Sequence, residues 1–159
     1  MERYACARDM FEGFRAAADE MRRYASAVRV MRAREGLHGQ RFDACGHGGG
    51  TRDANAATDA RLDYEDAMRP AIDADRALIA DARTVLHGTD GHGGVSAICG
   101  PVAAMVLELR YLDLLPWDAV GRAVCESPRT AQRRAAAALD AVDAYGVGRV
   151  VDGVGIACD

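Results

Sequence analysis

The sequence has no lysine and few aromatic side chains. All 20 basic residues are arginine, and Phe, Trp and Tyr together make up 6% of a chain that is 50% hydrophobic. The interior must therefore be built largely from Ala, Leu, Val and Met, whose small side chains allow helices to pack closely. This composition favours an all-α fold over a thick sandwich of sheets.

Long apolar runs are also absent. No window approaches the roughly 18 uninterrupted apolar residues of a membrane-spanning helix, and residues 1–11 lack the apolar stretch of a secretory signal. The cysteines are odd in number and dispersed, which indicates reduced thiols and not a disulfide framework. They are Cys6, Cys45, Cys99, Cys125 and Cys158. We expect a cytoplasmic protein that does not contact a membrane.

The chain also lacks a strongly basic balance. Its net charge is −4, which argues against a non-specific nucleic-acid coat, because such binding depends on many phosphate contacts. A local cluster of arginines remains compatible with a small specific footprint, or with a protein that gains affinity from a partner.

Residues 2–34 predict one long helix. Its apolar side chains recur at seven-residue steps, a spacing typical of a helix that packs against another along its whole length. The series are Tyr4, Phe11, Ala18 and Ala25; Ala7, Phe14, Met21 and Val28; and Met10, Ala17, Tyr24 and Met31. The arginines on the other faces predict a solvated surface. Because the apolar face is unusually wide, we also expect self-association or a partner contact through the N-terminal helices.

Residues 53–87 predict a second long helix, which completes a hairpin with the first. Pro70 lies inside its pattern, so a kink or break is expected near Arg69. The apolar stripe consists of Leu62, Met68, Ile72, Ile79, Ala82 and Leu86. Its outer side is acidic, which predicts ion pairs with the arginine-rich first helix. These carboxylates have no accompanying nucleophile, partner histidine or phosphate loop, so we do not expect an enzyme.

Two glycine-rich connectors, residues 36–52 and 88–94, flank the second helix. In the first, Cys45, His47 and His38 suggest a metal site. However, C-x-H is not a structural zinc spacing and no second pair of close ligands follows. We therefore predict a flexible connector, with no metal and no cofactor.

A three-helix unit is predicted within residues 95–146. Val102, Met105, Val106, Leu109 and Leu112 form the apolar stripe of its first helix. Pro116 suits the first turn of a short second helix, residues 117–124, with Trp117, Val120 and Val124 on the inner side. We expect Trp117 to be largely buried.

The third helix of this unit is predicted to begin after Ser127, a strong N-cap residue followed by Pro128, and to end at Gly146. Small Gly121 lies where the second and third helices would cross, which is typical of a helix-turn-helix. Arg129, Thr130, Gln132 and Arg133 would point out from the N-terminal end of the third helix, as base-reading side chains do. Ser127 and Arg134 would lie nearer to phosphates.

This stretch resembles region 4 of bacterial sigma factors. The likeness rests on residues 107–111 (LELRY), 117–121 (WDAVG) and 127–131 (SPRTA). It is closer still to small phage-encoded sigma-like regulators, in which two helical segments and a Gly-rich connector precede the sigma-like unit. The chain departs from the family at Cys125, where the turn usually has Gly, and at Leu115, which replaces a capping Ser or Thr.

The resemblance implies a transcriptional regulator that binds double-stranded promoter DNA, with RNA polymerase as a second expected partner. Two other interpretations stay open: a phage DNA-packaging component of the small-terminase kind, and a protein-interaction module with a sigma-like fold. The predicted organisation is a helical hairpin at residues 1–94, the sigma-like unit at 95–146, and a tail at 147–159. The tail has too many glycines for a helix, and a short strand, back-packing and mobility remain alternatives for it.

Overall fold

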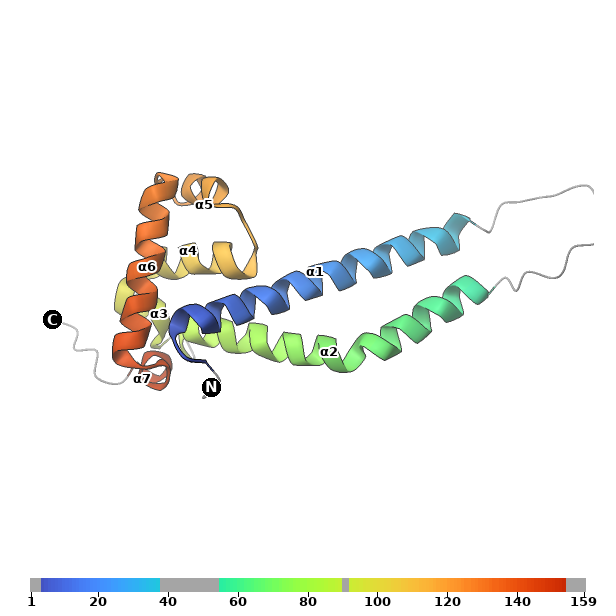
Figure 1. Cartoon of the computed structure of the whole chain (residues 1–159), viewed down its shortest axis with the longest axis horizontal. Helices are drawn as coiled ribbons and strands as arrows, with labels where there is room; N and C mark the ends of the chain where they lie inside the picture. The colour runs from blue at the N-terminus through green and yellow to red at the C-terminus, as the bar shows by residue number, and fades with distance from the viewer. Residues whose placement is uncertain (1–3, 38–54, 90–91, 154–159) are drawn as a thin grey trace, which may run out of the picture.

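The computed structural model describes residues 4–37, 55–89 and 92–153. Within these ranges the chain forms helices and turns and no named strand, which confirms the all-α class. The elements are α1 (Ala7–Leu37), α2 (Ala56–His87), α3 (Gly94–Cys99), α4 (Pro101–Leu107), the π-helical η1 (Glu108–Leu112), α5 (Trp117–Ala123), α6 (Pro128–Tyr145) and α7 (Val147–Asp152). Figure 1 shows α1 and α2 running side by side as an arm that projects from a head built from the later helices.

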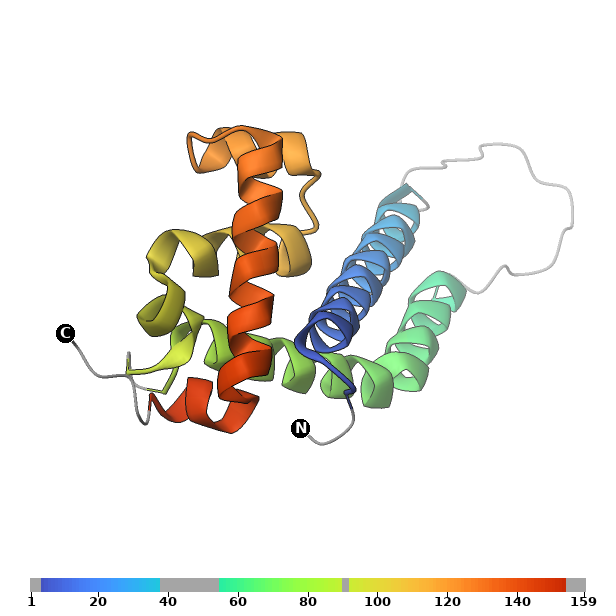
Figure 2. The ribbon, with the colours of Figure 1, turned by 60° about the vertical axis from the view of Figure 1, so that its left-hand side comes forward.

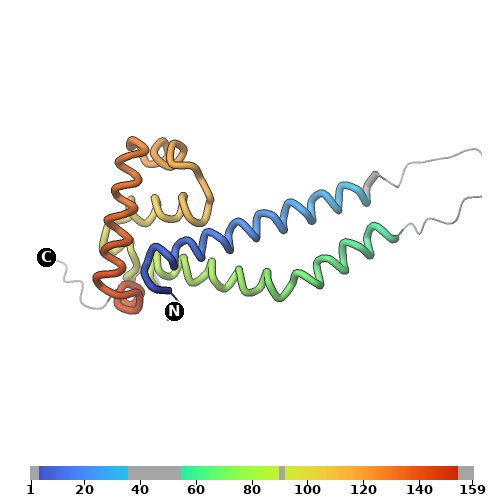
Figure 3. The backbone as a smooth tube through the Cα atoms, in the orientation of Figure 1, coloured from blue at the N-terminus to red at the C-terminus, as the bar shows by residue number. Residues whose placement is uncertain are grey.

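The arm is a pair of antiparallel helices, and α2 bends part-way along its length (Figure 3). Pro70 lies within α2, and its ring removes the N–H that would bond to the carbonyl four residues earlier. The predicted kink is thus present, but the helix continues through it.

Only one stripe of each arm helix is covered in the distal half of the arm. Ala25 and Leu62, which the apolar pattern placed on the inner faces, are exposed. Each helix there has a single neighbour, so the outer part of a wide apolar face has nothing to pack against. In the stripe between the helices, the rings of Tyr24 and Tyr64 stack with centroids 5.9 Å apart.

Ion pairs join the two helices near the tip of the arm. The Arg61 guanidinium of α2 lies 2.7 Å from Glu35 of α1 and 2.8 Å from Glu65 of α2. Arg32 of α1 reaches Glu65 at 3.6 Å. Inter-helix pairs were expected from α1 arginines to α2 acids, and Arg32 fits that expectation. In the shorter pair the arginine, Arg61, belongs to α2 and the acid, Glu35, belongs to α1.

The proximal ends of both arm helices share one hydrophobic core with the head. The ring of Phe11 meets Tyr111 of η1 edge to face, with centroids 5.4 Å apart. Val85 and Leu86 of α2 are fully buried. The remaining buried members are Ala7, Met10, Phe14, Ala82, Val95, Ala103, Ala104, Val106, Leu107, Val120, Ala131, Ala135, Ala138, Leu139, Val142 and Val150. Small aliphatic side chains dominate this core, as the low aromatic content predicts.

Polar contacts also fasten the arm to the head. The backbone N–H of Ala7 donates to Oδ1 of Asp143 on α6 over 2.6 Å, so a side chain of the head caps the first turn of α1. Arg22 donates to the backbone carbonyl of Asp113, in the loop before α5, over 2.9 Å. Figure 2 shows α6 standing across the base of the arm, where the first of these contacts forms.

The expectation that glycines exclude a helix after Tyr145 is wrong. Residues 147–152 form α7, whose Val150 is fully buried. Gly146 and Gly153 lie just outside α7 with φ of 82° and 67°, where glycine ends helices readily. Only Gly148 falls inside, and the burial of Val150 offsets its low helix propensity. The rest of the predicted tail lies outside the described residues.

The inner face of α4 also differs from the predicted stripe. Val106 is buried, but Val102 and Met105 are 39% and 47% exposed. Ala103, Ala104 and Leu107 are buried in their place. Nearly every side chain of this short helix is apolar, so its pattern defines no single face. The wider π-helical turn of η1 then changes the register that follows.

Candidate nucleic-acid interface

Gly121 allows α5 and α6 to approach closely at the turn between them. A Cβ atom on Gly121 would lie 2.7 Å from the Glu126 carbonyl oxygen and 3.0 Å from the Pro128 nitrogen. The chain closes the turn by a hydrogen bond in which the N–H of Glu126 donates to the carbonyl of Gly121 over 2.8 Å. The two atoms that a Cβ would meet both belong to the backbone, so only glycine fits at position 121 without moving the turn.

Cys125, within the same turn, adopts a left-handed conformation with φ of 57°. Side chains with a Cβ are strained in this region, which explains why glycine suits the position. The turn therefore keeps its shape despite an unfavourable residue. Cys125 is exposed and has a free thiol.

Ser127 caps α6 as predicted. Its Oγ accepts a hydrogen bond from the backbone N–H of Thr130 over 3.1 Å, and the two hydroxyl oxygens lie 2.8 Å apart. Pro128 occupies the first turn, where its missing N–H has no consequence. The helix ends at Tyr145, with Gly146 as its C-cap. The start of α6 is thus set by local sequence.

The two faces of α6 separate as expected. Ala131, Ala135, Ala138 and Leu139 are buried against the head, whereas Arg129, Gln132 and Arg133 are exposed. A shallow depression of about 480 Å³ is lined by Ser127, Arg129, Thr130, Gln132 and Arg133. The structure thereby brings together all but one of the residues predicted to contact DNA.

Arg134 differs from the other predicted contacts because it is engaged within the protein. Its Nε donates to Glu126 Oε2 over 3.3 Å, and its Nη2 pairs with Glu126 Oε1. These hydrogen bonds lower the pKa of the Glu126 carboxyl below its ordinary value, against the opposing effect of desolvation. The charge pattern of α6 alone did not reveal this pair, because Glu126 lies across the turn, before the helix begins.

Trp117 is partly buried and packs against the common core. The guanidinium carbon of Arg110 lies 5.0 Å from the centre of its ring system, a cation–π arrangement. Arg110 also donates to the carbonyl of Leu115 over 3.0 Å. The guanidinium of Arg110 therefore covers part of the indole.

A second groove, which the sequence pattern does not predict, adjoins the depression on α6. Its volume is about 440 Å³. It runs between α6 and the junction of α3 with α4, and its lining residues are Cys99, Ala103, Thr130, Arg133, Arg134, Ala137 and Ala138. Burial raises the pKa of the Cys99 thiol, so this cysteine stays protonated at neutral pH. The groove extends the arginine-bearing surface toward α3.

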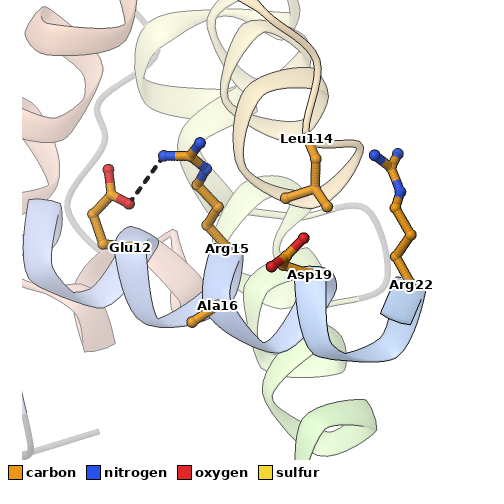
Figure 4. A pocket seen from close by; sticks show the side chains of 6 residues that line it. All are labelled: Glu12, Arg15, Ala16, Asp19, Arg22 and Leu114. Atoms are coloured by element: carbon orange, nitrogen blue, oxygen red, sulfur yellow. Dashed lines mark hydrogen bonds and ion pairs between the residues drawn. The ribbon is translucent and has the colours of Figure 1, made fainter. Parts of the chain in front are cut away.

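A hollow between α1 and the loop before α5 offers no comparable chemistry. Figure 4 shows Leu114 above α1, with Glu12, Arg15, Ala16, Asp19 and Arg22 around it. Glu12 and Arg15 pair with each other at 3.4 Å. The charges of this hollow balance, and its lining contains no nucleophile.

Metal binding and membrane insertion find no support in the described residues. Within residues 4–37, 55–89 and 92–153, no three His, Cys, Asp or Glu side chains gather in a way that could hold a metal ion. Cys45, His47 and His38, which suggested such a site, lie outside these ranges. Among the helices described, none combines the length and apolarity needed to cross a bilayer.

Comparison of the chain with protein-family models, curated proteins and solved structures gives no match.

Proposed function

We propose that this protein is a sequence-specific regulator of transcription that binds duplex DNA through α6. The observation that carries the proposal is the arrangement of α5, a tight turn and α6, with exposed Arg129, Gln132 and Arg133 at the N-terminal end of α6. In a helix-turn-helix, the N-terminal residues of the second helix contact base edges in the major groove. The negative net charge of the whole chain is compatible with a footprint confined to this cluster.

Each exposed side chain has a role that follows from its chemistry. Arg129 and Arg133 present forked donors that match the acceptors of guanine, and the Gln132 amide matches adenine. Ser127, at the cap of α6, is placed for a phosphate contact, and Thr130, in the first turn, is a further candidate for reading a base edge. Arg134, also expected near phosphate, is paired with Glu126.

The likeness of residues 107–131 to sigma region 4 supports promoter DNA as the target and RNA polymerase as a second partner. The same likeness favours phage or prophage genes as the regulated set. The small-terminase and protein-interaction interpretations predict other behaviour. A packaging component would assemble into rings of many subunits, and an interaction module would not bind duplex DNA at low salt.

The test is binding of the full-length protein to a duplex selected from a random library, compared with random duplex at two salt concentrations. Arg129→Ala and Arg133→Ala should each weaken binding to the selected site by about 1–3 kcal/mol and relax the preference at one base position. Arg149→Ala is the matched control, because it removes one exposed arginine from α7, at the other end of α6.

If both variants bind the selected site as tightly as the parent while the control also has no effect, α6 is not the recognition helix. The protein-interaction module would then be the better proposal.

A further inference from the structure

Glu126 lies in the turn between α5 and α6, and its side chain pairs with Arg134 of α6. The carboxylate accepts from two nitrogens of one guanidinium, the fork geometry that fixes orientation as well as distance. The Glu126 side chain is 18% exposed and that of Arg134 is 37% exposed. The pair is therefore partly shielded, unlike the solvated pairs Arg69–Asp66 and Arg76–Asp73 on the arm.

The backbone of Glu126 also holds the turn. Its N–H bonds to the Gly121 carbonyl, and its own carbonyl oxygen lies where a Gly121 side chain would be. The neighbouring Cys125 is in a strained conformation. A contact that holds the Glu126 side chain therefore also fixes the path of the chain from α5 into α6.

We propose that Arg134 is a positioning residue for DNA recognition: it clamps Glu126 and so sets the orientation of α6, and it does not contact phosphate. This inference rests on the proposed DNA binding. If so, the charge of Arg134 does not contribute to the salt dependence of DNA binding. The pairing of Arg134 with Glu126 instead affects how Arg129 and Arg133 meet the bases.

The two roles predict different effects of Arg134→Gln in the full-length protein. A positioning residue acts on recognition, so affinity for the selected duplex should fall about two- to fivefold, while affinity for random duplex and the salt slope stay unchanged. A phosphate contact would lower both affinities alike and reduce the slope by about one unit.

Two further variants sharpen the test. Arg134→Lys keeps the charge but loses the fork, so a clamp predicts no rescue, whereas a phosphate contact predicts recovery. In a Glu126→Gln background the clamp is already broken, so Arg134→Gln should have no additional effect. Arg149→Gln is the control for loss of one positive charge, and it should leave both affinities unchanged.

Rescue by Arg134→Lys, a smaller salt slope, or an undiminished effect of Arg134→Gln in the Glu126→Gln background would each overturn the inference. If the parent binds no duplex DNA at any salt concentration, the proposed function fails instead. The clamp is then judged by a double-mutant cycle of unfolding free energies at positions 126 and 134: measurable coupling supports it, and zero coupling overturns it.

Discussion

Gly121 and Gly148 both lie inside helices, but an added methyl group would meet different surroundings at the two positions. At Gly121 it would collide with the backbone of the turn, whereas at Gly148 nothing lies within 4 Å. We predict that Gly121→Ala destabilises the protein by about 1–3 kcal/mol through overpacking. Gly148→Ala, the matched control, should stabilise it by about 0.5–1 kcal/mol, because alanine loses less backbone entropy in a helix. Chemical denaturation of both variants measures the difference, and equal effects would contradict the close approach at the turn.

Cys125 gives a second prediction at the same turn. Its φ of 57° is strained for any side chain with a Cβ, so Cys125→Gly should raise the free energy of unfolding by about 1 kcal/mol. Cys125→Ala retains the Cβ and should have little effect, which separates relief of backbone strain from loss of the thiol. Thermal melts of the three proteins provide the measurement, and identical melting of the Gly and Ala variants would refute the strain.

Which residues could be predicted from sequence depends on how local their interactions are. Ser127 and Gly146 were placed correctly because a cap is decided within one helical turn. The contact between Trp117 and Arg110 was not predicted, because Arg110 lies on another element. The Arg134–Glu126 pair was missed for a related reason, since Glu126 lies in the turn and Arg134 on the helix that follows it.

At the scale of elements, the arm depends on the ion pairs near its tip. Hydrogen bonds from Arg61 lower the pKa of Glu65 below its ordinary value of 4.5, with desolvation acting the other way. Because the pKa of Glu65 is lower in the folded state, its ion pair with Arg61 stabilises the folded arm above pH 4.5. This stabilisation is lost as the pH falls through the folded pKa. We predict that amide protection in the distal arm decreases below pH 4.5 before the head loses protection, as measured by hydrogen exchange.

Arg61→Ala should reproduce this local opening at neutral pH. The matched control is Arg76→Ala, which breaks an exposed pair with Asp73 within α2, and pairs of that kind contribute little. Equal protection of the arm in the two variants would show that the Arg61 network does not hold the helices together.

The longer helices and the short α5 could be predicted, but α3 and α7 could not. The predicted segments at residues 2–34, 53–87 and 128–145 correspond to α1, α2 and α6, because several turns of periodic apolar residues define a face. Gly94–Cys99 and Val147–Asp152 are too short for a period to show. They form because Val95 and Val150 are buried in the common core, a tertiary effect that overrides local propensity.

For the whole molecule, the common core predicts that the head does not fold alone. A fragment starting at Ser96 would lack Phe11, Val85 and Leu86, which are fully buried in the intact chain. Each large side chain contributes about 1.5–3 kcal/mol when buried, a substantial part of the stability of a small domain. We expect this fragment to show poorly dispersed amide NMR signals, whereas the full chain shows dispersed ones. A dispersed spectrum from the fragment would contradict this dependence.

Self-association through the arm stays a prediction. Val30 and Leu62, on different helices of the arm, are 48% and 46% exposed. Sedimentation of the full chain at roughly tens of micromolar, the range of weak coiled coils, should detect a dimer or larger species. Val30→Asp together with Leu62→Asp should then return a monomer, because neither side chain belongs to the core of the head. A monomeric parent at that concentration would rule the association out.

The hydrogen bond between Ala7 and Asp143 joins residues 136 positions apart, and this separation has a consequence for synthesis on the ribosome. The first turn of α1 emerges early, but its capping carboxylate does not exist until residue 143 has been translated. Closing so long a loop costs entropy that only late contacts recover. The start of α1 therefore reaches its final position only after α6 has been made, so a segment that is translated well before α6 is fixed later than α6.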